Sequence, residues 1–144
     1  MKIVAILVAA TILFFMPVTV AGTAQDEAGP VLELPDALIL RYAQVAKGED
    51  GRDPAMPACV MRNRILRGWN PDKVLNHFYA PARRVSDSEL AAVKAAVLYG
   101  AGCDERAYFQ FSDSDLRRVQ VCPGAFLFRV NGNSYFSIDA LKGC

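Results

Sequence analysis

The chain has 144 residues, which is enough for one compact domain and too few for a multidomain protein. Its hydrophobic content of 53% and charged content of 22% exclude an intrinsically disordered chain. A formal net charge of +1 provides no electrostatic field that would attract nucleic acid, so we expect no nucleic-acid partner.

The N-terminal residues have the pattern of a secretory signal peptide. Lys2 precedes a long apolar run over residues 3–16, and small residues follow as far as Ala24. We predict a signal peptide over residues 1–24, with cleavage after Ala24; Ala21 offers a second cleavage site. An uncleaved membrane anchor is the alternative interpretation of the same run. The signal peptide predicts an exported protein, periplasmic or extracellular.

The four cysteines favour disulfide bonds over a metal site. All lie beyond the predicted cleavage site, and an even number of cysteines in an exported chain indicates disulfides: Cys59, Cys103, Cys122 and Cys144. Structural zinc needs closely spaced ligand pairs, which are missing here, and His77 is the one imidazole in the sequence. Nucleotide-binding glycine loops are also missing from the sequence. We therefore expect no metal and no cofactor.

The mature chain is predicted to hold one domain, residues 35–144, after a flexible tether over residues 25–34. The tether is polar and contains Gly and Pro. The first helix is predicted to begin with Asp36 as its N-cap and to end at Gly48.

Three further helices are predicted from their start and stop signals. Asp53 followed by Pro54 starts a helix over residues 54–67, and a similar Asn-Pro pair starts a short helix over residues 72–77. The S-D-S-E sequence at residues 86–89 matches a capping box, which starts a helix over residues 90–99.

The last part of the chain has the pattern of strands. The aromatic segment 108–111 is β-prone, and segments 126–130 and 134–138 flank an Asn-Gly-Asn turn at residues 131–133. The order of about four helices followed by a small antiparallel sheet predicts an α+β domain.

Two adjacent acids, Glu49 and Asp50, are the strongest catalytic candidates. They follow directly on the first predicted helix, where free carbonyl groups disfavour negative charge. A carboxyl group in such a place suits a general acid that protonates a glycosidic oxygen. The alternative is an ordinary hydrated loop in which Lys47 and Arg52 are surface partners of the acids.

Segments 42–49 (Y-A-Q-V-A-K-G-E) and 58–65 (A-C-V-M-R-N-R-I) resemble the opening of the SleB-like cell wall hydrolases, which is close to N-E-A-R-G-E, a loop, and A-V-x-x-V-x-N-R. The segment at residues 68–71 and the aromatic strands near residues 108 and 135 extend the resemblance over residues 37–138. The resemblance implies a lysozyme-like or SleB-like α+β domain that acts on peptidoglycan glycan strands.

One position departs from that family pattern. Lys47, Gly48 and Glu49 match its R-G-E, and Asn63 with Arg64 match its N-R, but its first glutamate falls on Val45. The resemblance makes that first glutamate the catalytic acid, and valine cannot donate a proton. Either Glu49 or Asp50 has taken over the role, or the fold is kept without the cleavage chemistry.

Four other residues are candidates for substrate binding. Asn63 could bind a sugar amide or hold a loop, and Arg64 could bind substrate or pair with one of the two acids. Trp69 and Tyr108 could stack against sugar rings or belong to the core.

The predicted hairpin also suggests the disulfide pairing. With Val130 opposite Ser134, Cys122 lies opposite residue 142, two residues before Cys144. A bridge between Cys122 and Cys144 would close the open end of the hairpin within the usual Cα separation of a disulfide. The remaining pair would be Cys59 and Cys103.

The sequence therefore predicts an exported enzyme that cleaves peptidoglycan glycan strands, by hydrolysis or by lytic transglycosylation. The alternative is a non-catalytic secreted module of the same fold that binds glycan or an envelope protein, which the valine at position 45 favours. A third possibility is a small disulfide-bonded protein whose partner the sequence does not reveal.

Overall fold

The computed structural model describes residues 29–143, so the predicted signal peptide and Cys144 lie outside the described residues. Its helices are α1 (Asp36–Glu49), α2 (Ala55–Leu66), α3 (Pro71–Val74), α4 (Asp87–Lys94) and α5 (Asp113–Leu116). Its strands are β1 (Phe109–Ser112), β2 (Phe126–Val130) and β3 (Asn133–Phe136), which form one antiparallel sheet in the order β1-β3-β2. The predicted α+β class is confirmed.

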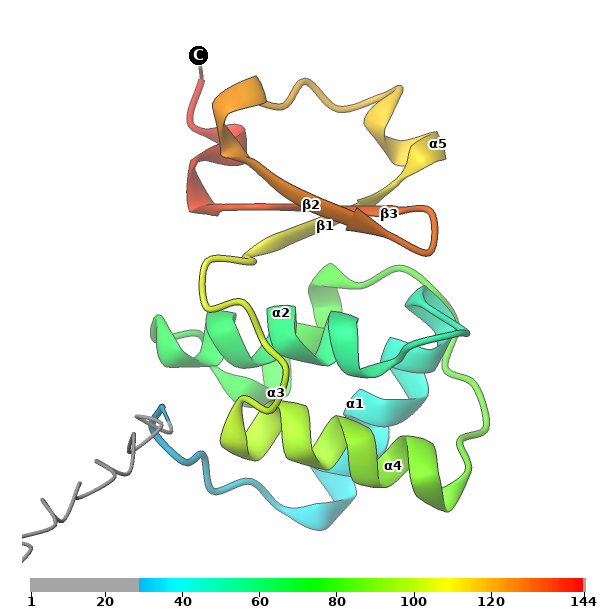
Figure 1. Cartoon of the computed structure of the whole chain (residues 1–144). Helices are drawn as coiled ribbons and strands as arrows, with labels where there is room; N and C mark the ends of the chain where they lie inside the picture. Colours follow the sequence, from blue (N-terminus) through cyan, green and yellow to red (C-terminus); the bar gives the residue numbers. More distant parts are fainter. Residues whose placement is uncertain (1–28, 144) are drawn as a thin grey trace, which may run out of the picture.

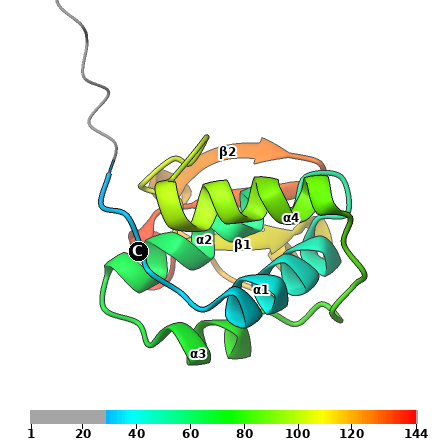
Figure 2. The same ribbon diagram turned by 90° about the horizontal axis from the view of Figure 1, so that it is seen from below.

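Helix α2 lies at the centre of the molecule, with the sheet on one side and helices α1 and α4 on the other (Figures 1 and 2). Every residue from Pro57 to Arg64 is buried, including two arginines and an asparagine. Val60 of α2 packs with Tyr135 of β3, which joins the helical layer to the sheet. No helix within residues 29–143 is long and apolar enough to cross a membrane.

The local signals at the helix ends act as predicted in three places. Ser86 and Glu89 form the capping box of α4, with the Glu89 amide donating to Ser86 Oγ and Glu89 Oε2 accepting from the Ser86 amide. Asn70 Oδ1 accepts from the Asp72 amide at the start of α3. Gly68, which follows α2, has a φ of 92° that side-chain-bearing residues rarely adopt.

The first helix differs from its prediction at both ends. Pro35 takes the N-cap position, because its carbonyl accepts from the amides of Leu38 and Ile39 at 2.9 and 3.1 Å, and Asp36 is the first helical residue. At the other end α1 continues past Gly48 and ends at Glu49. The difference matters for function, because it places the Glu49 side chain on the last turn of a helix.

The hairpin forms as predicted, but its predicted register is wrong. Asn131 and Gly132 both have positive φ, 52° and 81°, so the turn contains two residues and Val130 pairs with Asn133 rather than with Ser134. An irregularity between Phe126 and Phe128 shifts the pairing once more.

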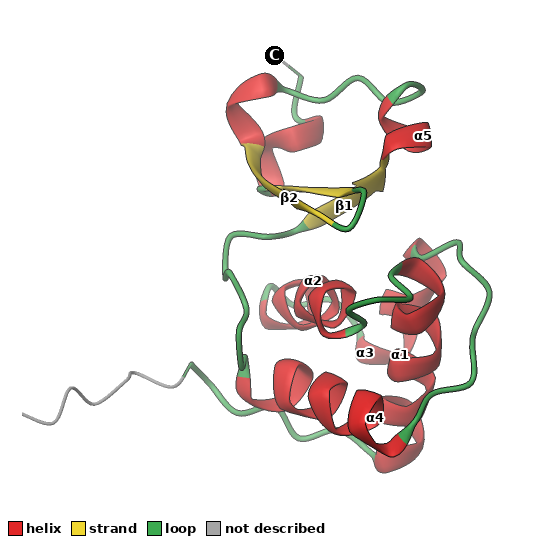
Figure 3. Cartoon of the chain, turned by 45° about the vertical axis from the view of Figure 1, so that its right-hand side comes forward, coloured by secondary structure: helices red, strands yellow, loops and turns green. Residues whose placement is uncertain are grey.

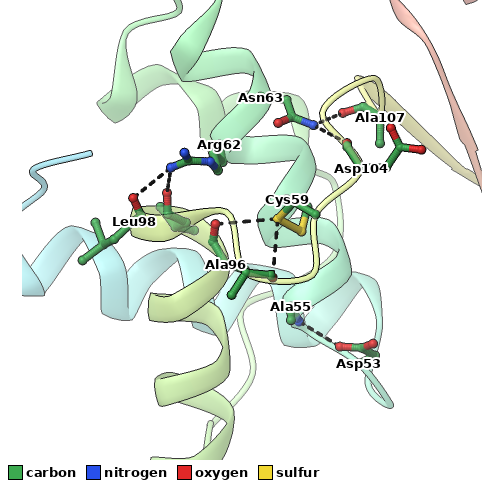
Figure 4. Close-up of a disulfide and its surroundings, with 12 residues drawn as sticks. Asp53, Ala55, Cys59, Arg62, Asn63, Ala96, Leu98, Asp104 and Ala107 are labelled. Atoms are coloured by element: carbon green, nitrogen blue, oxygen red, sulfur yellow. Dashed lines mark hydrogen bonds between the residues drawn. A yellow bond between two sulfur atoms is a disulfide. The ribbon is translucent and has the colours of Figure 1, made fainter. Parts of the chain in front are cut away.

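The disulfide between Cys59 and Cys103 is present, as predicted, with a Cα separation of 5.3 Å. Figure 4 shows how it joins α2 to the loop that follows α4. The predicted bridge between Cys122 and Cys144 includes a residue outside the described range, so it stays a prediction. The register from which it was argued is not the one observed, although the Cys122 amide donates to the Ala140 carbonyl across the end of the hairpin at 3.0 Å.

The described part of the predicted tether, residues 29–34, is bound to the helices. The Leu32 amide donates to the Leu98 carbonyl at 2.9 Å, and Arg62 Nη2 donates to the Pro30 carbonyl. Nη1 of the same arginine donates to the carbonyls of Val97 and Leu98, beyond the end of α4 (Figure 4). Burial lowers the pKa of Arg62, while the charge of Glu105 opposes this shift.

Candidate functional site

A groove of about 710 Å³ opens between the end of α1, the segment after α3, and strand β1. Figure 3 shows the helical layer, with α1 and α3, and next to it the sheet that contains β1. The groove is lined by the apolar and aromatic residues Trp69, Phe78, Tyr79, Phe109, Phe111, Val119 and Leu141, and by the polar and charged residues Glu49, Arg64, His77, Gln110, Ser112, Asp115, Arg118 and Asn133, with Gly48 and Ala80 completing its wall. Mixed aromatic and polar linings of this size are typical of small-molecule sites.

The structure places Glu49 in the wall of this groove. Its Oε1 accepts from the amides of Tyr79 and Ala80, both at 2.9 Å. The other oxygen, Oε2, makes no hydrogen bond within the described residues. Glu49 therefore holds the neighbouring segment with one oxygen, and the other oxygen takes no part in that contact.

The position of that carboxylate depends on a close backbone contact. A Cβ at Gly48 would lie 2.1 Å from the carbonyl oxygen of Pro81, so the helix end and the segment after α3 can approach each other only with glycine there. The Arg83 amide also donates to the Gln44 carbonyl at 2.8 Å, which holds the same segment on α1.

The second predicted acid, Asp50, does not line the groove. It is 4% exposed, and its Oδ1 accepts from the amides of Arg52 and Asp53 at 2.9 and 3.1 Å. Its Oδ2 accepts from Asn131 Nδ2 in the hairpin turn at 3.2 Å. Asp50 therefore shapes the loop before α2 and connects it to the sheet.

Arg64 is a buried cation in the groove wall. It is 5% exposed, its Nε donates to the Tyr108 carbonyl at 3.1 Å, and it forms no ion pair with either predicted acid. Four aromatic rings lie 5.0–5.7 Å from its guanidinium carbon: Trp69, Phe78, Tyr108 and Phe109. Burial lowers the pKa of Arg64, and the neighbouring tyrosines and Glu49 oppose that shift.

The two predicted stacking residues differ in their access to the groove. Trp69 lines it and makes edge contacts with His77 and Tyr108, at centroid distances of 4.6 and 6.1 Å. Tyr108 is 5% exposed and does not line the groove. Trp69 can therefore contact a ligand in the groove, whereas Tyr108 packs against Trp69 and Arg64 beneath the groove surface.

Asn63 holds a loop instead of facing the groove. Its Nδ2 donates to the carbonyls of Asp104 and Ala107 at 2.9 and 2.7 Å (Figure 4). It is 3% exposed and lies outside the groove lining. Of the two roles considered for this residue, its contacts match the structural one.

Sequence reasoning missed several groove residues, of which Gln110 is the clearest. It lies between Phe109 and Phe111 on β1, and period-2 alternation turns it to the opposite face from its neighbours. Phe109 and Phe111 line the groove too, so alternation along β1 does not single out Gln110, and its polarity within an aromatic run was the usable signal. Asp115 and Arg118 enter the groove from α5 and the residues after it, and no sequence pattern linked them to Glu49.

Val45, the position of the expected family glutamate, is half-buried against the core of the helical layer. Residues 29–143 contain no group of three or more His, Cys, Asp or Glu side chains that could hold a metal ion. Comparisons of the chain with protein-family models, with curated proteins and with solved structures gave no match.

Proposed function

We propose that this protein is an exported enzyme that cleaves the glycan strands of peptidoglycan, with Glu49 as the acid. The observation that carries the proposal is the position of Glu49 at the end of α1, in the wall of an open groove, with one carboxyl oxygen uncommitted. The disulfide between Cys59 and Cys103 is compatible with export, because such bonds persist in oxidising compartments.

The groove has the surface that a sugar chain needs. Trp69, Phe109 and Phe111 provide aromatic surface for the apolar faces of sugar rings, and Tyr79, which is 92% exposed, stands at its rim. Charged and amide side chains alternate with these rings and can bind sugar hydroxyl and acetamido groups.

The proposed chemistry uses the uncommitted oxygen of Glu49. Its proton passes to the glycosidic oxygen as the bond from that oxygen to the anomeric carbon breaks, which leaves an oxocarbenium-like sugar. A water molecule, or a hydroxyl group of the same sugar, then adds to the anomeric carbon and returns a proton to Glu49. Within the described residues, Asp115 is the other carboxylate that lines the groove, and its proposed role is to stabilise the cationic sugar or to orient the water.

The test is to incubate the purified mature protein with peptidoglycan and to analyse the released muropeptides by mass spectrometry. We expect soluble fragments from the wild type and at least a hundredfold slower release from Glu49→Gln, because general acid catalysis contributes about 10²–10⁴-fold. Glu33→Gln is the matched control, since Glu33 is exposed and lies outside the groove. Equal rates for wild type and Glu49→Gln would refute the assignment, and the mass of the new reducing end distinguishes hydrolysis from transglycosylation.

A second candidate is a non-catalytic module that binds glycan or an envelope protein through the same groove. Two observations favour it: Val45 occupies the expected acid position, and Glu49 Oε1 already accepts two backbone hydrogen bonds. Wild-type protein that sediments with peptidoglycan but releases no fragments would support this candidate over the enzyme. Protein that neither sediments with peptidoglycan nor cleaves it would exclude both glycan functions.

A further inference from the structure

The groove runs along an unpaired edge of the sheet. β1 stands at one end of the strand order β1-β3-β2, so only one of its edges is paired within the described residues. Successive side chains of a strand point to opposite faces, yet all four residues of β1 line the groove: Phe109, Gln110, Phe111 and Ser112. The groove therefore passes along the other edge of β1. Each of these residues is partly exposed, whereas every residue of the central strand β3 is buried.

The hairpin turn determines which backbone groups of β3 bond to β1. A turn of two residues makes Val130 and Asn133 a hydrogen-bonded pair, so the backbone N–H and C=O groups of Asn133 point to β2. These groups alternate in direction along a strand, so those of Ser134 and Phe136 point to β1. The Phe136 carbonyl does accept from the β1 side, where the Tyr108 amide donates to it at 2.8 Å.

The same alternation leaves the backbone of Gln110 free to bond a ligand. The β1 residues opposite Ser134 and Phe136 are Phe111 and Phe109, so the N–H and C=O groups of these two phenylalanines bond to β3. Those of Gln110, which lies between them, point the other way, to the groove. No loop, helix or side chain within the described residues bonds to them.

The two edges of the sheet differ in their protection against a further strand. β2, at the opposite edge, has an irregular register between Phe126 and Phe128 and carries the exposed Arg129. Bulges and charges of this kind hinder pairing with another chain. β1 has a regular register with β3 and contains neither a charged residue nor a proline. The edge in the groove is therefore the one that can accept a strand.

We propose that the groove binds an extended segment of another protein, which adds a fourth strand to the sheet beside β1. The N–H and C=O groups of Gln110 exchange two hydrogen bonds with the central residue of that segment. With the usual strand and sheet spacings, four residues of a strand fill about 650 Å³, and the groove offers about 710 Å³. The inference goes beyond glycan cleavage and does not depend on it. A bound strand would occupy the groove that Glu49 lines, so such a partner would inhibit an enzyme with Glu49 as its acid.

The walls of the groove specify the composition of the segment. Gln110 pairs with Tyr135, which packs against the helical layer, so the central residue of the segment points to that layer. The residues on either side of it point to the other face, where Phe109 and Phe111 favour β-branched or aromatic partners. The charged residues of the lining balance, with two of each sign: Arg64, Arg118, Glu49 and Asp115. A neutral segment with apolar residues beside its centre therefore fits best.

The experiment uses the mature protein and a neutral capped peptide, acetyl-Thr-Val-Thr-Val-Thr-amide, and measures amide hydrogen exchange by NMR. In the free protein, the Gln110 amide should exchange faster than the amides of Phe109 and Phe111, which bond to β3. Saturation with the peptide should slow exchange of the Gln110 amide at least tenfold. The same peptide with an N-methyl group on its central threonine should bind at least tenfold more weakly, because it lacks one hydrogen bond and its methyl group lies between the strands.

A pair of variants separates the backbone of Gln110 from its side chain. Gln110→Pro removes the N–H that points to the groove, a change that an edge strand tolerates at such a position. We expect peptide binding at least tenfold weaker than in the wild type. Gln110→Val keeps the N–H and should bind the peptide within about threefold of the wild type. If the proline variant fails to fold, the exchange rates and the N-methylated peptide decide the question with the wild-type protein.

Three results would overturn the inference: a Gln110 amide that exchanges as slowly as its neighbours in the free protein, no slowing by the peptide at millimolar concentration, or equal affinity for the N-methylated peptide. Slowing by soluble muropeptides but not by the peptide would overturn it too, and would assign the edge to peptidoglycan. Slowing that depends on protein concentration alone would assign it to a second copy of the chain. Peptide binding without peptidoglycan cleavage would support the inference and refute the enzyme proposal, and cleavage without peptide binding would do the reverse.

Discussion

Replacing Asn63 with alanine should destabilise the protein strongly, although the sequence alone left a ligand-binding role open for this residue. The side chain donates from Nδ2 to the carbonyls of Asp104 and Ala107 at 2.9 and 2.7 Å. Alanine leaves both carbonyls without that donor, at about 1–3 kcal/mol for each one that stays buried. The Asp104 carbonyl keeps a hydrogen bond from the Ala107 amide at 3.0 Å, so most of the cost falls on the Ala107 carbonyl. With the packing lost at this buried position, we expect a total loss of about 2–4 kcal/mol.

The assay is equilibrium unfolding in urea, followed by tryptophan fluorescence. With a slope of about 2 kcal/mol per molar urea, the expected loss lowers the unfolding midpoint by about 1–2 M. Asn63→Asp sharpens the test, because an ionised carboxylate cannot donate to the two carbonyls. Burial beside carbonyl oxygens should raise the pKa of the new carboxyl above its unfolded value. The folded state then binds more protons, so the Asp variant should lose stability relative to the Ala variant as the pH rises from 4 to 7.

An Asn63→Ala variant whose unfolding free energy lies within about 0.5 kcal/mol of the wild type would refute this reasoning, because changes of that size are typical of surface sites. If that variant also lost glycan binding, Asn63 would have the ligand role that its contacts argue against. An Asp variant with the opposite pH trend would show that the carbonyls do not face the side chain.

Three further outcomes are expected. Gly48→Ala should lower the melting temperature and slow glycan release, because its Cβ would lie 2.1 Å from a backbone carbonyl of the segment that Glu49 holds, and an unchanged melting temperature would contradict this. Replacing Cys59 and Cys103 by alanine should cost about 4 kcal/mol of unfolding free energy for a bridge that spans 44 residues, and a loss below about 1 kcal/mol would contradict the loop-entropy argument. Burial raises the pKa of Tyr42 from 10.0 to about 12, and the negative charge of Asp72 adds to the shift. The stability that this group contributes is therefore present below pH 10 and declines as the pH approaches 12. Tyr42→Phe should lose the hydrogen bond to the Pro71 carbonyl, at about 1 kcal/mol of unfolding free energy, and should also lose this alkaline dependence of stability.

The elements of the helical layer were predictable because their signals are local. The capping box at Ser86, the Asn70 cap and the glycine after α2 each act through neighbours a few residues away. The hairpin register was not predictable in the same way. An Asn-Gly-Asn sequence suits a turn of two or of three residues, and the choice between them reverses which side chains face the core. Burial of Tyr135 against Val60 is satisfied by the two-residue turn observed.

The candidate site was predictable only in part. Glu49 could be found from its place at a helix end, and Arg64 from its pairing with Asn63 in the family-like motif. The roles of their neighbours depend on contacts between distant segments. Asp50 is held outside the groove by a hydrogen bond from Asn131, which lies 81 residues later in the sequence. No local sequence pattern predicts a contact between residues so far apart. Gln110 becomes a groove residue only because β1 lies against α2 (Figure 1).

The disulfide described above also has a consequence for the order in which the molecule is built. Both of its cysteines belong to the part of the chain that precedes β1, and they join α2 to the loop that follows α4. A chain that enters an oxidising compartment N-terminus first can form this disulfide before the residues of the three strands have entered. The helices are then cross-linked before the sheet forms, so the groove is completed last, when the final quarter of the chain, from β1 onward, packs against α2.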